Sequence, residues 1–296
     1  MYNYTVIIPH KNCPDLLQRA LASVPLREDI QTIIVDDNSD PSKVDFENFP
    51  GLNRPNTIVV FDKSGKGAGR ARNIALSKIE DNTKWVTFLD SDDFFVENAD
   101  AIFEKYINNT NDLIVFHCDS VYSDTLKPAN RHVEWNKKLL KAKKEPELVR
   151  FKLDGPVAKF ISYNVIKSNS LKFEEIRVGN DAMFSLQVGI CSNTVEVSDS
   201  LLYVMSVREN SLTKQNDFTS LLIRYEGGIR QNFLLKEVGK MRYRVNMFYW
   251  AYCFLPCGIG VFLKYFFKAF TDTYPQFILS DLYKCFVGFL NNKNKI

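Results

Sequence analysis

The sequence predicts an α/β fold with a mostly parallel central sheet. Over the first 120 residues, short and almost wholly apolar runs alternate with segments of helical periodicity, which is the pattern of strands covered by helices on both faces. A polar cluster follows each of the first four apolar runs. The composition, with 45% hydrophobic and 25% charged residues, is that of a globular protein and excludes disordered and collagen-like chains.

The elements are expected in a regular order. Residues 5–8 form a β-rich run ended by Pro9, and residues 16–24 carry Leu and Ala at helical spacing. Apolar runs predict further strands at 31–35, 57–61, 85–89 and 113–116, with helices near 70–79 and 99–107. Residues 195–207 resemble a strand pair, and 218–238 one or two helices. Ligands of parallel sheets bind at the carboxyl ends of the strands, so the clusters after residues 8, 35, 61 and 89 are expected to converge.

Two domains are expected, residues 1–210 and a helical extension at 211–296, and the charge of the chain changes toward its end. The 296 residues carry a net charge of +3, too small to suggest a nucleic-acid-binding protein, so no nucleic-acid partner is expected. Residues 236–296, however, carry nine Lys and Arg against three acids, and the rest of the chain is slightly acidic. The extension is therefore basic, and it is also rich in aromatic residues.

An uncharged stretch at 245–263 reaches the length of a membrane span, but Pro256, Gly258 and Gly260 interrupt it. Three interpretations stay open: a peripheral helix on an anionic membrane surface, a buried helical hairpin, and a true span. The surrounding aromatic and basic residues favour the first.

The amino terminus does not resemble a signal peptide, and the six cysteines are scattered, which favours a reduced cytoplasmic setting. Together with the basic, aromatic extension, this predicts a location at the inner face of the cell membrane.

The acidic turn at residues 90–93, Asp-Ser-Asp-Asp, directly follows an apolar run. Carboxylates so close together repel each other by about 1 kcal/mol per pair even in water. A hard divalent cation, Mg²⁺ or Mn²⁺, would relieve that repulsion and could share its coordination shell with substrate phosphates. The alternative is that Asp92 or Asp93 caps the helix that follows.

Two other clusters suggest a nucleotide. The acids of residues 36–40 could accept hydrogen bonds from a base or a ribose, although Asp-Asn-Ser-Asp is also ordinary turn chemistry. Residues 63–73 combine glycines with Lys66, Arg70 and Arg72 at a helix start, which suits an anion. Neither a P-loop nor a dinucleotide-binding fingerprint matches, and a flexible loop before the helix is the alternative.

Together these residues resemble the motifs of family 2 glycosyltransferases of the GT-A fold. The resemblance covers about the first 95 residues, in the family's order: Val-Ile-Ile-Pro at 6–9 with Asn12, Ile-Ile-Val-Asp-Asp-Asn-Ser-Asp at 33–40, Ala-Arg-Asn at 71–73 and Phe-Leu-Asp-Ser-Asp-Asp at 88–93. It implies a nucleotide diphosphate sugar as donor, a divalent cation (Mn or Mg) as cofactor, and inversion at the anomeric carbon.

The resemblance also implies roles on the donor side. Pro9 and Lys11 would border the nucleotide base, with Lys11 in the place of the family's usual aromatic residue, and Asp37 would bind the base. Arg72 would lie near the diphosphate.

On the same grounds, Asp90 would approach the ribose, and Asp92 would hold the metal that bridges the phosphates.

The catalytic base of the family is placed by the same resemblance. The family has a Glu-Asp pair some 80 to 100 residues beyond the acidic turn, and Asn180 and Asp181 occupy that place here. Asp181 is therefore the expected catalytic base, and the Asn at 180 departs from the family's pattern. The alternative is that Asp181 is a helix N-cap. Residues 155–164, with Lys159, resemble the preceding segment and are expected to line the acceptor pocket.

The sequence thus predicts an inverting, metal-dependent hexosyltransferase acting on a glycan or lipid-linked acceptor in cell-surface polysaccharide synthesis, with a peripheral membrane contact. Two alternatives stay open. One is a catalytically inactive nucleotide-sugar-binding or scaffold protein, which the Asn at 180 would suit. The other is a nucleotidyltransferase, which also uses carboxylates and a metal.

Overall fold

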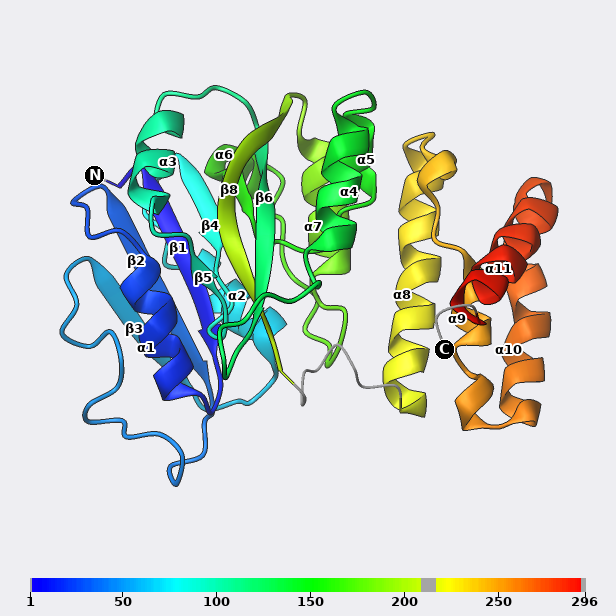
Figure 1. Ribbon diagram of the computed structural model, residues 1–296, viewed down its shortest axis with the longest axis horizontal. Helices are drawn as coiled ribbons and strands as arrows, with labels where there is room; N and C mark the ends of the chain where they lie inside the picture. Colours follow the sequence, from blue (N-terminus) through cyan, green and yellow to red (C-terminus); the bar gives the residue numbers. More distant parts are fainter. Residues whose placement is uncertain (1, 209–216, 294–296) are drawn as a thin grey trace. The chain divides into compact units, whose positions relative to one another are not determined.

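The structure, a computed structural model, describes residues 2–208 and 217–293. The chain divides into two compact units, Met1–Asn210 and Ser211–Ile296. Each unit is described by itself, and Figure 1 shows the elements of both.

The described residues of the first unit form one eight-stranded sheet in the order β3-β2-β1-β4-β7-β6-β8-β5. Its strands are β1 (Tyr4–His10), β2 (Ile30–Asp37), β3 (Thr57–Asp62), β4 (Trp85–Phe88), β5 (Phe94–Phe95), β6 (Leu113–Tyr122), β7 (Lys159–Ser162) and β8 (Val195–Val207).

The first four strands in the sequence pair in parallel, as predicted, with β1 between β2 and β4 and with β3 beyond β2. Strand β6 is also parallel to β8, but β4–β7, β6–β7 and β5–β8 are antiparallel. Parallel pairs therefore make up four of the seven pairings. The α/β class is confirmed, with a sheet that is parallel in its first half and mixed in its second.

The expected strand pair at 195–207 is wrong, because these residues form the single strand β8. The polar Ser-Asp-Ser at 198–200 resembles a turn in the sequence. In the structure β8 continues through it along β6, and shifts of register near His117 take up the irregularity. A β-bulge, rather than a turn, accommodates these polar residues.

Helices cover both faces of this sheet. They are α1 (Pro14–Ser23), α2 (Ala68–Leu76), α3 (Ala99–Tyr106), α4 (Val133–Ala142), α5 (Glu147–Phe151), α6 (Tyr163–Ser168) and α7 (Ala182–Cys191). Successive residues of a strand point to opposite faces. Accordingly, Val6 and Ile8 of β1 join the hydrophobic cluster that includes α1 and α3, whereas Ile7 joins the cluster that includes α2 and α7. This double burial explains why the predicted strands are apolar throughout.

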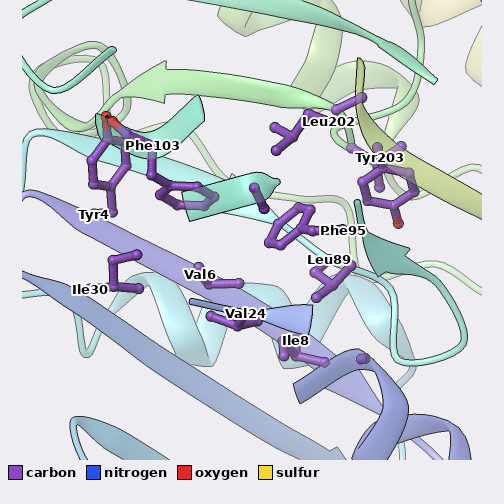
Figure 2. Close-up of a cluster of buried hydrophobic side chains, with 14 of the residues drawn as sticks. Tyr4, Val6, Ile8, Val24, Ile30, Leu89, Phe95, Phe103, Leu202 and Tyr203 are labelled. Atoms are coloured by element: carbon purple, nitrogen blue, oxygen red, sulfur yellow. Dashed lines mark hydrogen bonds between the residues drawn. The ribbon is translucent and has the colours of Figure 1, made fainter. Parts of the chain in front are cut away.

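The cluster on the α1 and α3 face extends to the carboxyl end of β4. Figure 2 shows Tyr4, Val6 and Ile8 of β1 in the same cluster as Leu89, which directly follows β4. Tyr203 of β8 belongs to this cluster as well and is fully buried. The acidic turn that begins one residue after Leu89 therefore starts from a rigid, packed base.

The second unit is helical, with its own buried cluster around Tyr225, Phe248 and Phe254. Its elements are α8 (Phe218–Glu237), η2 (Met241–Tyr243), α9 (Met247–Tyr252), η3 (Leu255–Cys257), α10 (Ile259–Asp272), η4 (Pro275–Phe277) and α11 (Ile278–Lys293). Buried Arg244 pairs with Asp281 and thereby joins the segment before α9 to α11.

The uncharged stretch at 245–263 is not one helix. Pro256 lies in the short η3 turn, and Gly258, at φ +111° in the left-handed region, separates that turn from α10. In the described part of the chain, no helix combines the length and the apolar character needed to cross a membrane. The interpretation as a true span is therefore wrong for these residues.

Candidate active site

The polar residues after β1, β2 and β4 lie at one edge of the sheet, together with the starts of α2 and α7. Parallel pairing brings the carboxyl ends of these strands together, as the register Pro9 with Val35 and His10 with Asp36 shows. Side-chain hydrogen bonds then connect the segments that converge there. Asp37, Arg72 and Asp90 each take part in such a bond between segments far apart in the sequence.

Asp36 shapes this edge and is fully buried. One carboxylate oxygen contacts Nδ1 of His10 at 2.8 Å, and the other accepts the backbone N–H of Ser39 at 2.9 Å. The backbone N–H of Cys13 donates to Nε2 of His10 at 3.1 Å, so the hydrogen bonds assign the proton of His10 to Nδ1. The interpretation of residues 36–40 as ordinary turn chemistry therefore fits Asp36, whose carboxylate binds within the turn. The carboxylate of Asp37 makes different contacts.

Asp37 joins the ends of β1 and β2 to the loop before α2. Nζ of Lys11 donates to its Oδ2 at 3.1 Å and to its carbonyl oxygen at 2.8 Å, and the backbone N–H of Gly67 donates to Oδ1 at 2.9 Å. Gly67 has φ +91°, a left-handed conformation that suits glycine. The three predicted base-site residues Pro9, Lys11 and Asp37 therefore share one edge. The anion that the Gly67 amide binds here is the carboxylate of Asp37.

Arg72 of α2 is buried and connects two further segments. Its Nη2 donates to Asp90 Oδ1 at 2.7 Å, its Nη1 donates to Asn180 Oδ1 at 3.0 Å, and its guanidinium lies 5.2 Å from the centre of the Phe173 ring. Among the described residues its Nε is buried without a partner. Arg72 thus holds the acidic turn and the start of α7 together, and Asn180 supplies a neutral oxygen for that link.

Asp181 occupies the residue before α7, but its side chain makes no capping hydrogen bond within the described residues. The N-cap alternative therefore does not account for this carboxyl group. Burial raises the pKa of Asp181, and the nearby Arg72 guanidinium lowers it. A carboxylate with a raised pKa that is not engaged in capping has the properties of a general base.

The acidic turn brings oxygens of Asp90, Asp92 and Asp93 within 4.8 Å of one another. Asp93 is buried, and both of its oxygens have partners: the Tyr203 hydroxyl donates to Oδ2 at 2.8 Å and the Ser206 N–H to Oδ1 at 2.6 Å. Burial raises the pKa of Asp93 well above its ordinary value, and the neighbouring acids raise it further. Asp93 therefore anchors the turn to β8.

Asp92 is paired with an arginine from beyond β8. Its Oδ2 lies 2.5 Å from Nη2 of Arg208, and its carbonyl oxygen accepts a 2.6 Å hydrogen bond from Nη2 of Arg19. Burial and then Asp90 raise the pKa of Asp92, whereas Arg208 lowers it. The alternative that Asp92 or Asp93 caps the next helix is wrong, because α3 begins at Ala99 with Asn98 at its N-cap position.

Asp90 and Asp92 fit a hard divalent cation. They offer carboxylate oxygens, which Mg²⁺ and Mn²⁺ prefer, and their side chains stay 34% and 19% exposed. Each already pairs with an arginine, so a cation would have to compete with Arg72 and Arg208. No local pattern in the sequence points to Arg208, which is 116 residues from Asp92.

A cavity of about 910 Å³ lies along α1, β5 and the start of α3. Its lining includes Arg19, Leu26 and Phe94. None of the predicted site residues lines this cavity. Arg19, which donates to the carbonyl of Asp92, is thus shared between this cavity and the acidic turn.

Comparison with known proteins places these features in a family. The family model described as glycosyl transferase family 2 matches residues 5–164. The minor teichoic acid biosynthesis protein GgaA of Bacillus subtilis (strain 168) is 36% identical over 102 residues, which are 32% of this chain and 23% of that protein. The succinoglycan biosynthesis protein ExoW of Rhizobium meliloti (strain 1021) is 36% identical over 114 residues, covering 37% of this chain and 35% of ExoW. These matches span well under half of either relative.

Among solved structures, residues 1–349 of S. aureus TarS in complex with UDP-GlcNAc superimpose with a TM-score of 0.62 at 22% identity. The match covers 79% of this chain and 66% of that one. At this identity the likeness shows the fold, and the predicted GT-A class is confirmed. Because the family model matches more than half of the chain and contains the motifs at residues 6–12, 33–40, 71–73 and 88–93, this chain belongs to glycosyl transferase family 2.

Proposed function

We propose that this chain transfers a sugar, with inversion, from a nucleotide diphosphate donor to a glycan or lipid-linked acceptor in cell-surface polysaccharide synthesis. The observation that carries the proposal is the link from Asn180 through Arg72 to Asp90, at the edge that also holds Asp37. Asp181 directly follows Asn180, and within the described residues its side chain makes no capping hydrogen bond. Two further findings support it. GgaA and ExoW are named for the synthesis of teichoic acid and succinoglycan, and the TarS structure contains a UDP-sugar.

In this mechanism the donor lies along the edge from Asp37 to Asp90, and the acceptor hydroxyl reaches the anomeric carbon from the side of Asp181. The acceptor oxygen forms a new bond to the anomeric carbon while the bond between that carbon and the diphosphate oxygen breaks. The electron pair of the broken bond leaves with the nucleoside diphosphate. Asp181 takes the hydroxyl proton. A divalent cation held by Asp92 would stabilise the charge on the departing diphosphate. Arg72 donates a hydrogen bond to Asp90 and thereby fixes the position of that carboxylate.

Replacement of the base tests the proposal directly. Asp181→Asn should lower kcat by about 10²- to 10⁴-fold, because general-base catalysis has that size, and leave donor binding in a thermal-shift titration near wild type. Asp199→Asn is the matched control, since Asp199 is exposed and pairs with Lys143 at the surface. Unchanged turnover in Asp181→Asn would refute the assigned role. A panel of nucleotide diphosphate sugars, beginning with UDP-GlcNAc and with and without Mn²⁺, identifies the donor by selective stabilisation.

The catalytically inactive alternative rests on Asn180, whose amide oxygen accepts the bond from Arg72. Release of free nucleoside diphosphate by the wild type, dependent on an acceptor, excludes that alternative. Selective binding of one donor without release or transfer supports it.

We also propose that the second unit contacts the cytoplasmic face of an anionic membrane, where a lipid-linked acceptor would be held. Exposed apolar residues recur every four positions on α10, at Ile259, Leu263 and Phe267, and exposed Lys264 and Lys268 lie on the same helix. Apolar and basic residues together suit an anionic interface.

Co-sedimentation with vesicles tests this contact. Wild-type protein should bind vesicles rich in phosphatidylglycerol better than neutral vesicles, and Phe267→Asp should weaken that binding. Phe233→Asp is the matched control, because Phe233 is a similarly exposed phenylalanine on a different helix, α8. Equal binding by wild type and Phe267→Asp would contradict the assignment of this face.

A further inference from the structure

Arg19, in the middle of α1, joins three separate segments of the first unit. Its Nη2 donates to the carbonyl oxygen of Asp92 at 2.6 Å and to Oγ of Ser206 in β8 at 2.9 Å. It also reaches Ser123, just beyond β6, where Nη1 donates to the carbonyl oxygen at 3.2 Å and Nη2 donates to Oγ at 3.3 Å. All four of these acceptors are neutral oxygens.

The strand ends that Arg19 contacts are themselves held in place. Ser123 lies just past the last residue pair of β6 and β8, and its N–H donates to the Val207 carbonyl at 3.0 Å. Ser206 is buried, and its N–H donates to the carboxylate of Asp93. The same serine therefore contacts the acidic turn twice, once directly and once through Arg19.

Arg19 fixes a part of the acidic turn that the anchor at Asp93 does not reach. The Asp93 carboxylate is held by Tyr203 and Ser206, but the peptide group between Asp92 and Asp93 is held at its oxygen by Arg19. Because a peptide group is planar, a fixed carbonyl oxygen constrains the whole plane from one Cα atom to the next. The Asp92 side chain leaves the backbone at one end of that plane, so its direction depends on the hydrogen bond from Arg19.

A guanidinium suits this junction better than an ammonium would. The two Nη atoms of Arg19 reach acceptors in three segments at once, whereas a lysine has one donor atom at the end of its chain. The guanidinium also lies 5.0 Å from the centre of the ring of Phe94, two residues after Asp92. Its Nε is buried without a partner among the described residues, which carries a cost in free energy. The contacts of the Nη atoms, and not those of Nε, therefore set the orientation of this side chain.

We propose that Arg19 is a positioning residue for the proposed metal ligand Asp92, and that it acts through the backbone of the acidic turn. This inference rests on the proposed function, in which Asp92 holds a divalent cation at the donor diphosphate. Two arginines contact Asp92, but on different groups: Arg208 pairs with the carboxylate, whereas Arg19 binds the carbonyl oxygen. Their effects on a cation should therefore have opposite signs, since Arg208 competes for the carboxylate and Arg19 holds that carboxylate in place.

The sign of the change in Mn²⁺ affinity tests this inference. Arg19→Ala removes a positive charge next to Asp92, so electrostatics alone would raise the affinity for a cation. Loss of positioning should instead lower the affinity by about 10-fold, the size of one hydrogen bond to a charged group. Titration of Mn²⁺ in the absence of donor, followed by electron paramagnetic resonance, compares wild type, Arg19→Ala and Arg208→Gln.

Two more variants separate positioning from charge and from folding. Arg19→Lys keeps the charge but cannot span the three segments, so it should also bind Mn²⁺ more weakly than wild type. Arg54→Ala is the matched control: Arg54 lines the same cavity as Arg19, but its Nη2 donates to the carbonyl oxygen of Val24 at 2.7 Å. The control should bind Mn²⁺ as wild type does. Melting temperatures measured without metal establish that each variant is folded, and Arg19→Lys suffices if Arg19→Ala does not fold.

Three results would overturn the inference. They are a Mn²⁺ affinity in the folded Arg19 variants that equals or exceeds that of wild type, an equal loss of affinity in Arg54→Ala, and a wild-type protein that binds no Mn²⁺. Failure of this inference is distinguishable from failure of the proposed function. Wild-type protein that transfers sugar, with normal Mn²⁺ binding in the Arg19 variants, sinks only the role of Arg19. Wild-type protein that binds Mn²⁺ but transfers no sugar sinks the proposed function, and weaker binding in the Arg19 variants would still support the role of Arg19 in the turn.

Discussion

Gly69 of α2 makes a close backbone approach to the segment before the proposed base. A Cβ atom at Gly69 would lie 2.2 Å from the carbonyl oxygen of Glu174 and 3.1 Å from Cβ of Asn180. Ordinary contacts of a Cβ atom begin near 3.4 Å, so Gly69→Ala requires the backbone at Glu174 to retreat by about 1 Å and Asn180 by a few tenths of an ångström. Because the Glu174 N–H donates to the Asn180 carbonyl at 3.3 Å, the movement would also disturb the 3.0 Å hydrogen bond from Arg72 to the Asn180 side chain.

The expected effect on activity is larger than the effect on stability. Overpacking costs about 1 to 3 kcal/mol, but replacing glycine by alanine inside a helix regains up to about 1 kcal/mol, so the free energy of unfolding should fall by about 0 to 2 kcal/mol. The retreat at Glu174 is transmitted to Asp181 through the hydrogen bond between Glu174 and Asn180, and a displacement approaching 1 Å at a reacting group lowers the rate by up to about 10²-fold. Gly69→Ala should therefore remain folded and lose most of its kcat.

The assay pairs initial rates of nucleoside diphosphate release with urea denaturation. Gly227→Ala is the control, because Gly227 lies in α8 and its added Cβ would meet no atom closer than 3.8 Å. The control should be as stable as wild type or more so, with unchanged kcat. A Gly69→Ala protein with wild-type kcat would refute the reasoning, since it would show that the loop of Asp181 can move without consequence.

Three further predictions follow from the acidic turn and the base. Arg208→Gln removes the guanidinium that pairs with Asp92. In the absence of the nucleotide-sugar donor, this change should raise the affinity for Mn²⁺ about 5-fold, as measured by electron paramagnetic resonance. Unchanged or weaker Mn²⁺ binding would contradict competition between Arg208 and the cation. Tyr203→Phe leaves a buried oxygen of Asp93 without its donor and should cost about 1 to 3 kcal/mol in urea denaturation, and equal stability would count against the anchor. Burial raises the pKa of Asp181. As the pH is lowered, wild-type kcat/KM should therefore begin to fall at a pH above the ordinary pKa of aspartate, and a flat profile down to about pH 4 would argue against this base.

The first half of the sheet was predictable because its signals are local. Each strand is an apolar run that ends in polar residues, and parallel pairing alone then brings Lys11 to Asp37 at one edge. The second half was not predictable in the same way. The antiparallel β7 and the long β8 pair with β6 across large separations in the sequence, and the polar residues of β8 imitate a turn.

The site shows the same division between local and distant causes. The sequence indicates the chemistry of Arg72 and Asp90, but the reason for a glycine at position 69 is a carbonyl of residue 174, which no local pattern contains. The glycines of residues 63–73 were expected to let backbone N–H groups approach an anion. In the structure Gly67 donates to Asp37, and Gly69 leaves room for the backbone of Glu174.

The three acids of the turn at 90–93 show why an acidic motif alone does not define a metal site. Asp93 is buried against Tyr203, with both oxygens engaged by donors of β8, so its carboxylate maintains the turn. Asp90 and Asp92 remain partly exposed, and each faces an arginine from another element. The sequence shows three equivalent carboxylates, whereas the tertiary contacts leave two candidate ligands. A bound cation would have to displace or share those arginine contacts, so any affinity of this turn for metal would depend on Arg72 and Arg208 as well as on the acids.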